Sequence, residues 1–89
     1  MEDKKPLRNQ DFRLEKMDDE LLLFNPQTNN ILYLNETAAL IWQLCDGHSA
    51  VDKIVSLLTE SFPEAGTDIK QDVEETIALF KIQGAIHLI

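Results

Sequence analysis

Residues 34–47 read Leu34-Asn35-Glu36-Thr37-Ala38-Ala39-Leu40-Ile41-Trp42-Gln43-Leu44-Cys45-Asp46-Gly47, and they join a strand pattern to a helix pattern. Asn35 is a favourable N-cap residue, and Glu36 complements the positive end of the helix dipole. Behind these two, apolar residues recur every three or four positions, at Ala38, Ile41, Leu44 and Cys45. Gly47 suits the left-handed conformation that ends many helices. The stretch therefore predicts the end of a strand, a capped helix and a turn.

Three short strands are predicted before this helix, over residues 12–16, 21–24 and 31–34. The first alternates apolar and polar residues, as a half-buried strand does. Residues 17–19 favour a turn, and residues 25–30 combine a proline that cannot donate to a strand ladder with asparagines that tolerate a hairpin. Because both connections are short, we expect an antiparallel meander.

Two more helices are predicted after Gly47. For the first of them we expect Ser49 as the cap and Pro63 at the end, with an apolar stripe of Val51, Ile54, Val55, Leu58 and Phe62. For the second we expect a cap at Thr67 or Asp68 and an end at Gly84, with an apolar stripe of Ile69, Val73, Ile77 and Phe80. Residues 85–89 then form a short extended tail.

The predicted fold is α+β and winged-helix-like, with a three-stranded antiparallel sheet followed by three helices. The chain has 89 residues, of which 44% are hydrophobic, and this predicts one globular domain. Residues 1–10 are mostly polar and predict a flexible N-terminal arm, so that the folded domain spans residues 11–89.

The charge of the chain disfavours nucleic acid as a partner. The net charge is −8, and from Glu20 onward the only basic residues are Lys53, Lys70 and Lys81. Nucleic-acid affinity depends on lysine and arginine displacing counterions from phosphates, which the acidic helices would instead repel.

The sequence holds little that an enzyme could use. Cys45 falls on the apolar stripe of the first helix and is interpreted as a core thiol. His48 and His87 are too few, without a second cysteine, for a recognisable metal site. We therefore expect no catalytic residue, no metal and no cofactor.

The same inventory favours a cytoplasmic protein without a membrane segment. A single cysteine cannot form an internal disulfide, which fits a reducing compartment. Residues 1–6 lack the apolar core of a signal peptide, and no apolar run approaches the roughly 18 residues of a membrane span.

The second and third predicted strands carry more apolar residues than one sheet face requires. Each has four in succession, so both of its faces are hydrophobic, whereas three small helices cover one face. Leu79 and Ile82 similarly lie off the main stripe of the last helix. There are three alternatives: residues 1–10 and 85–89 wrap this surface, a homodimer hides it, or an extended peptide docks along an exposed sheet edge.

The stretch quoted first resembles the signature of the PqqD-like family. That family shows a strand ending in Leu-Asn, then Thr-Ala, an Ile-x-x-Leu pair and Asp-Gly, and an Asp-Val pair later matched by Asp72-Val73. The resemblance spans roughly residues 12–86. It departs from the family at residues 25–27, which read Asn-Pro-Gln where members often carry Pro-Glu.

The resemblance implies a function. PqqD-like proteins are non-catalytic recognition elements that bind the leader of a ribosomally made precursor peptide and present it to a modifying enzyme, in the namesake pathway a radical S-adenosylmethionine enzyme. The leader adds as a strand beside the third strand and rests against the last helix. Carried over by position, the implied peptide-binding residues are Asn30, Ile31, Leu32, Tyr33, Leu34, Asp72, Val73, Thr76, Ile77, Phe80 and Lys81.

Two other functions are compatible with a winged-helix-like domain. One is a DNA-binding regulator, against which the acidic helices count. The other is a purely structural dimerisation module, for which the surplus of apolar residues on the strands would be the interface.

Overall fold

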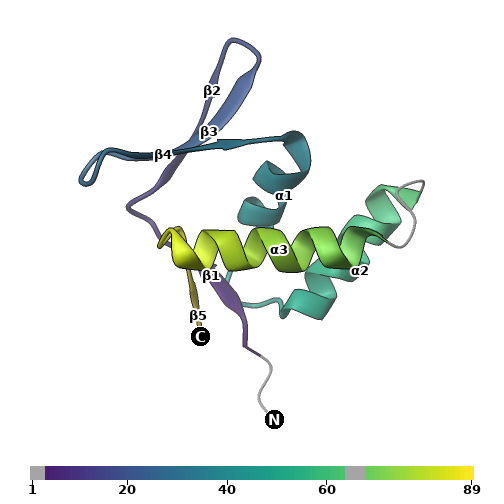
Figure 1. Cartoon of the computed structure of the whole chain (residues 1–89). Helices are drawn as coiled ribbons and strands as arrows, with labels where there is room; N and C mark the ends of the chain where they lie inside the picture. The colour runs from purple at the N-terminus through teal and green to yellow at the C-terminus, as the bar shows by residue number, and fades with distance from the viewer. Residues whose placement is uncertain (1–3, 64–67) are drawn as a thin grey trace.

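The structure contains a three-stranded antiparallel meander followed by three helices, as the turn and capping residues of the sequence predicted (Figure 1). The computed structural model describes residues 4–63 and 68–89. In chain order the elements are β1 (Pro6–Arg8), β2 (Arg13–Met17), β3 (Glu20–Asn25), β4 (Asn30–Leu34), α1 (Glu36–Leu44), α2 (Val51–Ser61), α3 (Asp68–Ile82) and β5 (Ile86–Leu88). Their bounds differ from the expected ones by a residue or two at most positions.

The main sheet has the strand order β2-β3-β4, and both of its pairings are antiparallel. Its two hairpin turns place Asp18 and Asn29 at positive φ, 55° and 62°. Aspartate and asparagine tolerate this left-handed conformation better than other residues with a side chain. The predicted turns are therefore confirmed.

Helix α1 lies against the inner face of this sheet. Its N-cap is Asn35, whose side chain accepts a hydrogen bond from the backbone N–H of Ala38 at 2.7 Å, as predicted. The core between the sheet and the helices is formed by Phe12, Leu23, Ile41, Trp42, Cys45, Ile54, Leu58, Ile69, Val73, Ile77, Phe80, Ala85 and Ile86.

The start of α2 differs from the prediction. Its N-cap is Ala50, which makes no side-chain capping bond, so the expected cap at Ser49 is wrong. The backbone N–H of His48 instead donates to Oδ1 of Asp46 at 2.8 Å. This bond folds the connection after α1 into its own turn, and α2 begins beyond it.

The end of α3 is a Schellman motif. The backbone N–H of Ala85 donates to the carbonyl of Phe80, and Gly84 N–H donates to Lys81, with Gly84 at a φ of 78°. The predicted stop at Gly84 is confirmed. Of the two expected caps at the other end of α3, Thr67 lies outside the described residues and Asp68 is the first helical residue.

A second, two-stranded sheet differs from the expected flexible arm. Strand β1 pairs antiparallel with β5, so that Pro6 lies opposite Leu88. On its other side β1 is bonded to the segment that follows α1. Arg8 N–H donates to the carbonyl of Cys45, and Gly47 N–H donates to the carbonyl of Pro6. Residues 6–8 are thus held on both sides, whereas residues 1–3 lie outside the described part.

The main sheet and the β1–β5 sheet lie at opposite ends of the molecule (Figure 1). The paired residues at the two chain ends therefore do not cover β4. Ile31 and Tyr33 on β4 remain 47% and 69% exposed, and Leu79 and Ile82 on α3 remain 45% and 79% exposed. For the described residues at the two chain ends, the alternative in which they wrap the surplus apolar residues is wrong.

Candidate functional site

Strand β4 is an edge strand of the main sheet. It pairs with β3 on one side, and no described strand pairs with its other side. An edge strand presents backbone N–H and C=O groups that can pair with another extended chain. This edge is therefore a place where a strand can be added.

The side chains of β4 alternate between the two sheet faces. Leu32 and Leu34 are half-buried and pack against the core on the side of α1. Ile31 and Tyr33 point to the outer face, where Tyr33 lies opposite the buried Leu22 in the sheet register. Both faces beside the free edge are thus apolar, as the run of four apolar residues suggested.

The predicted peptide-binding residues of α3 divide into two groups. Val73, Ile77 and Phe80 are buried and form the stripe that packs into the core. Asp72 and Thr76 lie one turn apart on a flank of that stripe and are at least partly exposed.

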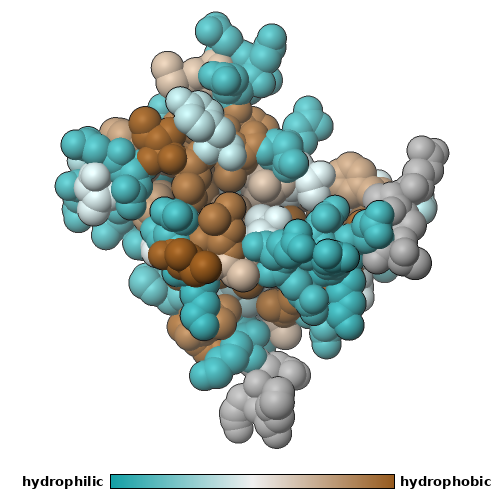
Figure 2. Space-filling model, in the orientation of Figure 1, coloured by the Kyte–Doolittle hydropathy of each residue, from teal (hydrophilic) through white to brown (hydrophobic). Residues whose placement is uncertain are grey.

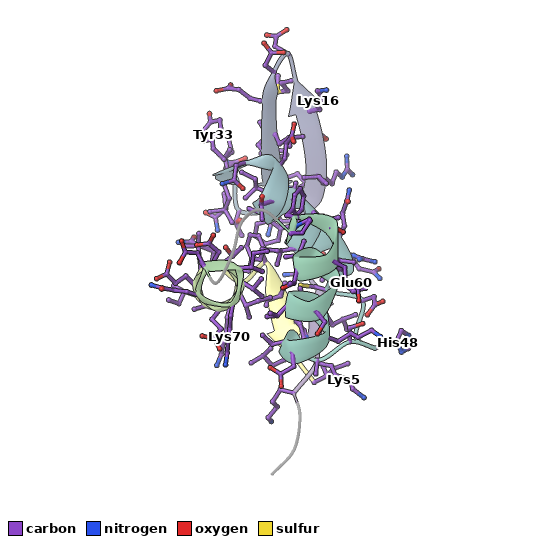
Figure 3. All side chains as sticks on the ribbon, turned by 90° about the vertical axis from the view of Figure 1, so that its right-hand side faces the viewer. Lys5, Lys16, Tyr33, His48, Glu60 and Lys70 are labelled. Carbon is purple, nitrogen blue, oxygen red and sulfur yellow. The ribbon has the colours of Figure 1, made fainter. Side chains whose placement is uncertain are left out.

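Lys81 lies on the other flank of α3. It follows Asp72 by nine positions, about two and a half helical turns, and so points to the opposite side. Lys70 shares the side of Lys81, and Figure 3 shows Lys70 pointing away from Tyr33. The flank that carries Asp72 and Thr76 is therefore the one turned toward β4.

Leu79 is not in the carried-over set of residues, although its position is close to theirs. It follows Asp72 by seven positions, about two turns, and therefore lies on the flank turned toward β4. A signal for it was present in the sequence, because Leu79 is a large apolar residue off the core stripe. Figure 2 shows hydrophobic side chains gathered between β4 and the C-terminal half of α3, and hydrophilic ones over its N-terminal half.

A small pocket lies at the N-terminal half of α3. Its volume is about 130 Å³, and it is lined by Thr37, Leu58, Phe62, Ile69, Asp72 and Val73. These residues come from the first turn of α1, the second half of α2 with its C-cap residue Phe62, and the first half of α3. The pocket thus lies at the end of the β4–α3 surface where β4 passes into α1.

Cys45 and Asp46, whose pKa values are shifted, lie away from the surface between β4 and α3. Burial raises the pKa of the Cys45 thiol to about 12, with opposition from the positive charge of Arg8, and its Sγ lies 3.1 Å from the carbonyl oxygen of Ile41. The hydrogen bond from His48 N–H holds the pKa of Asp46 below its usual range. Cys45 is therefore the core thiol that the sequence predicted.

Neither a metal-ligand cluster nor a membrane-spanning helix occurs in the described part of the chain. Over residues 4–63 and 68–89, no three His, Cys, Asp or Glu side chains are grouped so that they could hold a metal ion. None of the helices in these ranges has the length and apolar character needed to cross a membrane.

Comparison with known proteins identifies relatives. Residues 20–86 match the model of the family described as Coenzyme PQQ synthesis protein D (PqqD). A "PqqA binding protein" of Klebsiella pneumoniae (strain 342) is 48% identical over 46 residues, which are 52% of this chain and 49% of that protein. The match thus spans about half the length of this relative. A "PqqA binding protein" of Rahnella aquatilis is 33% identical over 75 residues, which are 82% of this chain and 76% of that protein.

Two solved structures share the fold. A lasso peptide synthetase B1 complexed with its leader peptide is 27% identical, with a TM-score of 0.73, and the match covers 93% of this chain and 98% of that one. TbiB1 in complex with the TbiA(beta) leader peptide is 16% identical, with a TM-score of 0.72 and coverage of 91% and 94%, and it supports the fold alone. The family-model match and the Rahnella relative confirm the resemblance found in the sequence: this chain belongs to the coenzyme PQQ synthesis protein D (PqqD) family.

Proposed function

We propose that this protein is a non-catalytic adaptor that binds the leader segment of a ribosomally made precursor peptide and presents the peptide to a modifying enzyme. The observation that carries the proposal is the free edge of β4, which runs beside an exposed flank of α3. Family membership supports it, as do the relatives named for binding PqqA and a structural neighbour that holds a leader peptide.

In this proposal the leader adds to the main sheet as a fourth strand next to β4. Main-chain hydrogen bonds to Asn30–Leu34 would supply affinity, and the alternating side chains would supply specificity. Side chains on the inner face of the added strand would meet the flank of α3 that carries Asp72, Thr76 and Leu79. We place the proposed contact there, because Val73, Ile77 and Phe80 are occupied by core packing.

The adaptor would act by raising the local concentration of the precursor at the enzyme, without performing chemistry itself. By resemblance to the namesake pathway, we propose a radical S-adenosylmethionine enzyme as the partner and the cytoplasm as the location. Neither the binding of the leader nor the presentation of the precursor to the enzyme needs a cofactor bound to this chain.

The decisive experiment is a titration of the isotope-labelled protein with synthetic leader peptides, followed by NMR. The probes are PqqA and the leader segments of short precursors encoded beside this gene. We expect the largest amide shifts in β4 and along the flank of α3 that carries Leu79. Shifts confined to α2 and to the β1–β5 sheet would contradict the proposal.

A second measurement tests strand addition itself. Each backbone nitrogen of a bound leader is methylated in turn, which removes one hydrogen-bond donor at a time. In an added antiparallel strand only every second residue donates to its neighbour. Affinity should therefore fall at alternate positions, and a loss without this period of two would argue against pairing with β4.

The two alternative functions, DNA binding and dimerisation, would each be recognised by a different measurement. A DNA-binding regulator should show a salt-sensitive mobility shift on duplex DNA, which the net charge of −8 disfavours. A dimerisation module should sediment as a tight dimer that no leader peptide dissociates.

A further inference from the structure

We propose that the pocket between α1, α2 and α3 holds one apolar side chain of the bound peptide, and that Asp72 favours a lysine or arginine next to it. This rests on the function proposed above and goes beyond it, because it assigns a sequence preference to the peptide. We call this pocket the anchor site, and its residues are Thr37, Leu58, Phe62, Ile69, Asp72 and Val73.

The anchor site lies within reach of a strand paired with β4. Strand β4 ends at Leu34, and Thr37 at the rim of the site is three residues further along the chain. Their Cα atoms can be at most about 11 Å apart, since consecutive Cα atoms are about 3.8 Å apart. An extended peptide covers such a distance in about four residues. A peptide that pairs with β4 and continues past Leu34 is therefore long enough to reach the site with about four further residues.

The chemistry of the anchor site suits an apolar side chain. Its floor is formed by the buried residues Leu58, Ile69 and Val73, and Phe62 at the rim is 41% exposed. The volume of about 130 Å³ is close to that of a well-studied apolar cavity of about 150 Å³ that binds benzene. A leucine, isoleucine or phenylalanine side chain is of matching size.

One carboxylate lines the anchor site, and two more belong to residues close to its lining residues along the helices. Asp72 lines it, Asp68 lies one turn earlier on the same side of α3, and Glu36 precedes Thr37 in the first turn of α1. The nearby cation Lys70 points to the other side of α3 (Figure 3). The local field therefore attracts a basic group that enters beside the apolar side chain.

Helix stability accounts for Asp68 but not for Asp72. A carboxylate in the first turn complements the helix dipole, and Asp68 is the first residue of α3. The dipole effect fades within one turn, and Asp72 stands in the second. Asp72 is exposed at the mouth of an apolar pocket, where it would meet a positively charged group of the bound peptide.

The test uses a yeast-displayed library of random peptides, selected on the full-length protein and on two variants. Thr37→Leu fills the mouth of the anchor site with an aliphatic side chain, and Asp72→Asn removes its charge. The matched controls are Thr59→Leu and Glu60→Gln on exposed positions of α2, and Figure 3 shows Glu60 on the side of α2 away from α3. Circular dichroism and urea unfolding verify that every variant is folded.

Peptides selected on the wild-type protein should share a leucine, isoleucine or phenylalanine next to a lysine or arginine. Thr37→Leu should lower their affinity by about 30-fold, the usual effect of losing a buried anchor, and abolish the apolar preference in a new selection. Asp72→Asn should lower affinity by about two- to fivefold, as an exposed ion pair does, and this loss should vanish when the basic residue of the peptide is replaced by citrulline.

The outcomes separate this inference from the function on which it rests. If no peptide is enriched, both fail. If enriched peptides perturb β4 but bind Thr37→Leu and Asp72→Asn as tightly as the two controls, the adaptor function stands and the anchor site is overturned.

Discussion

The indole Nε1 of Trp42 donates a hydrogen bond to the carbonyl oxygen of Ala85 at 3.2 Å, and so joins α1 to the segment that leads into β5. The guanidinium of Arg8 on β1 lies 5.7 Å from the centre of the same indole ring and bonds the carbonyl of Gln43. One side chain thus links three elements that are far apart in the sequence. The polar contacts of Trp42 serve the β1–β5 end of the molecule and leave the β4–α3 surface free.

Replacing Trp42 by phenylalanine should destabilise the fold by about 1–3 kcal/mol. The substitution keeps an aromatic ring in the core but leaves the buried carbonyl of Ala85 without its indole donor. Urea unfolding followed by circular dichroism measures the change. An unchanged free energy of unfolding would mean that the bond contributes nothing to stability, and leader affinity should be unaffected in a folded variant.

Gly47 and Gly84, which have positive φ in the described part of the chain, offer a matched pair of substitutions. Gly84→Ala introduces only backbone strain, because a Cβ there would meet nothing within 4 Å, and should cost about 1 kcal/mol. Gly47→Ala carries similar strain, and its Cβ would also lie 3.1 Å from Cδ1 of Leu7 and 3.3 Å from Cδ1 of Ile89.

Hydrogen exchange distinguishes the two glycine variants. Gly47→Ala should accelerate exchange of the amides that pair β1 with β5 more than Gly84→Ala does, because only the former displaces side chains at that end. Equal protection in the two variants would mean that the Cβ added at residue 47 does not displace Leu7 or Ile89.

The buried thiol of Cys45 should make stability fall with rising pH. Its pKa is raised from 9.0 to about 12 by burial. Above pH 9 the unfolded chain loses this proton while the folded protein keeps it, so the free energy of unfolding decreases by about 1.4 kcal/mol per pH unit until pH 12.

The measurement compares urea unfolding of the wild type and of Cys45→Ala between pH 8 and pH 11. The difference between their free energies of unfolding should be constant up to about pH 9 and then shrink as the wild type loses stability. A difference that stays constant over the whole range would show that the native thiol ionises as easily as the unfolded one.

Leu79 should contribute to leader binding without contributing to the core. Leu79→Gln removes an apolar side chain from the flank of α3 turned toward β4, and should weaken leader affinity by about tenfold. Ala78→Gln is the control, because Ala78 is exposed but points about 100° away around the helix. Isothermal titration calorimetry measures both. Equal effects of the two substitutions would remove Leu79 from the binding surface.

The parts of the fold that were predictable depend on local chemistry. The cap at Asn35, the turn residues Asp18 and Asn29 and the stop at Gly84 each depend on one residue and its immediate neighbours, and all four are found as expected. The order of strands and helices was also correct, because apolar runs and stripes separated by turn and cap residues mark each of these elements in the sequence.

The parts that were missed depend on contacts between distant residues. Strand β1 has three residues and begins with proline, so it shows no period of two, and its partner lies at the other end of the chain. Because β1 is short and has polar neighbours, the sequence of residues 1–10 predicted a flexible N-terminal arm. Ser49 has good capping chemistry, but the turn made by Asp46 displaces the start of α2 beyond it.

The candidate site was predictable in outline only. Position along the chain led to the proposal of β4 and α3, but it does not show which side of α3 faces the strand. Phe80 and Leu79 are neighbours with similar hydrophobicity, yet one is fully buried and the other is 45% exposed. The direction of Lys70 in the folded molecule settles which flank of the helix lies beside β4 (Figure 3).

The pairing of β1 with β5 also determines how the protein can be tethered. Lys5 and Ile89 bond each other through N–H and C=O in both directions, at 2.8 Å and 2.9 Å. A linker attached at either residue would therefore start from the same end of the molecule, opposite the main sheet (Figure 1). An enzyme fused through either residue would begin from one shared point of attachment and leave the edge of β4 unobstructed.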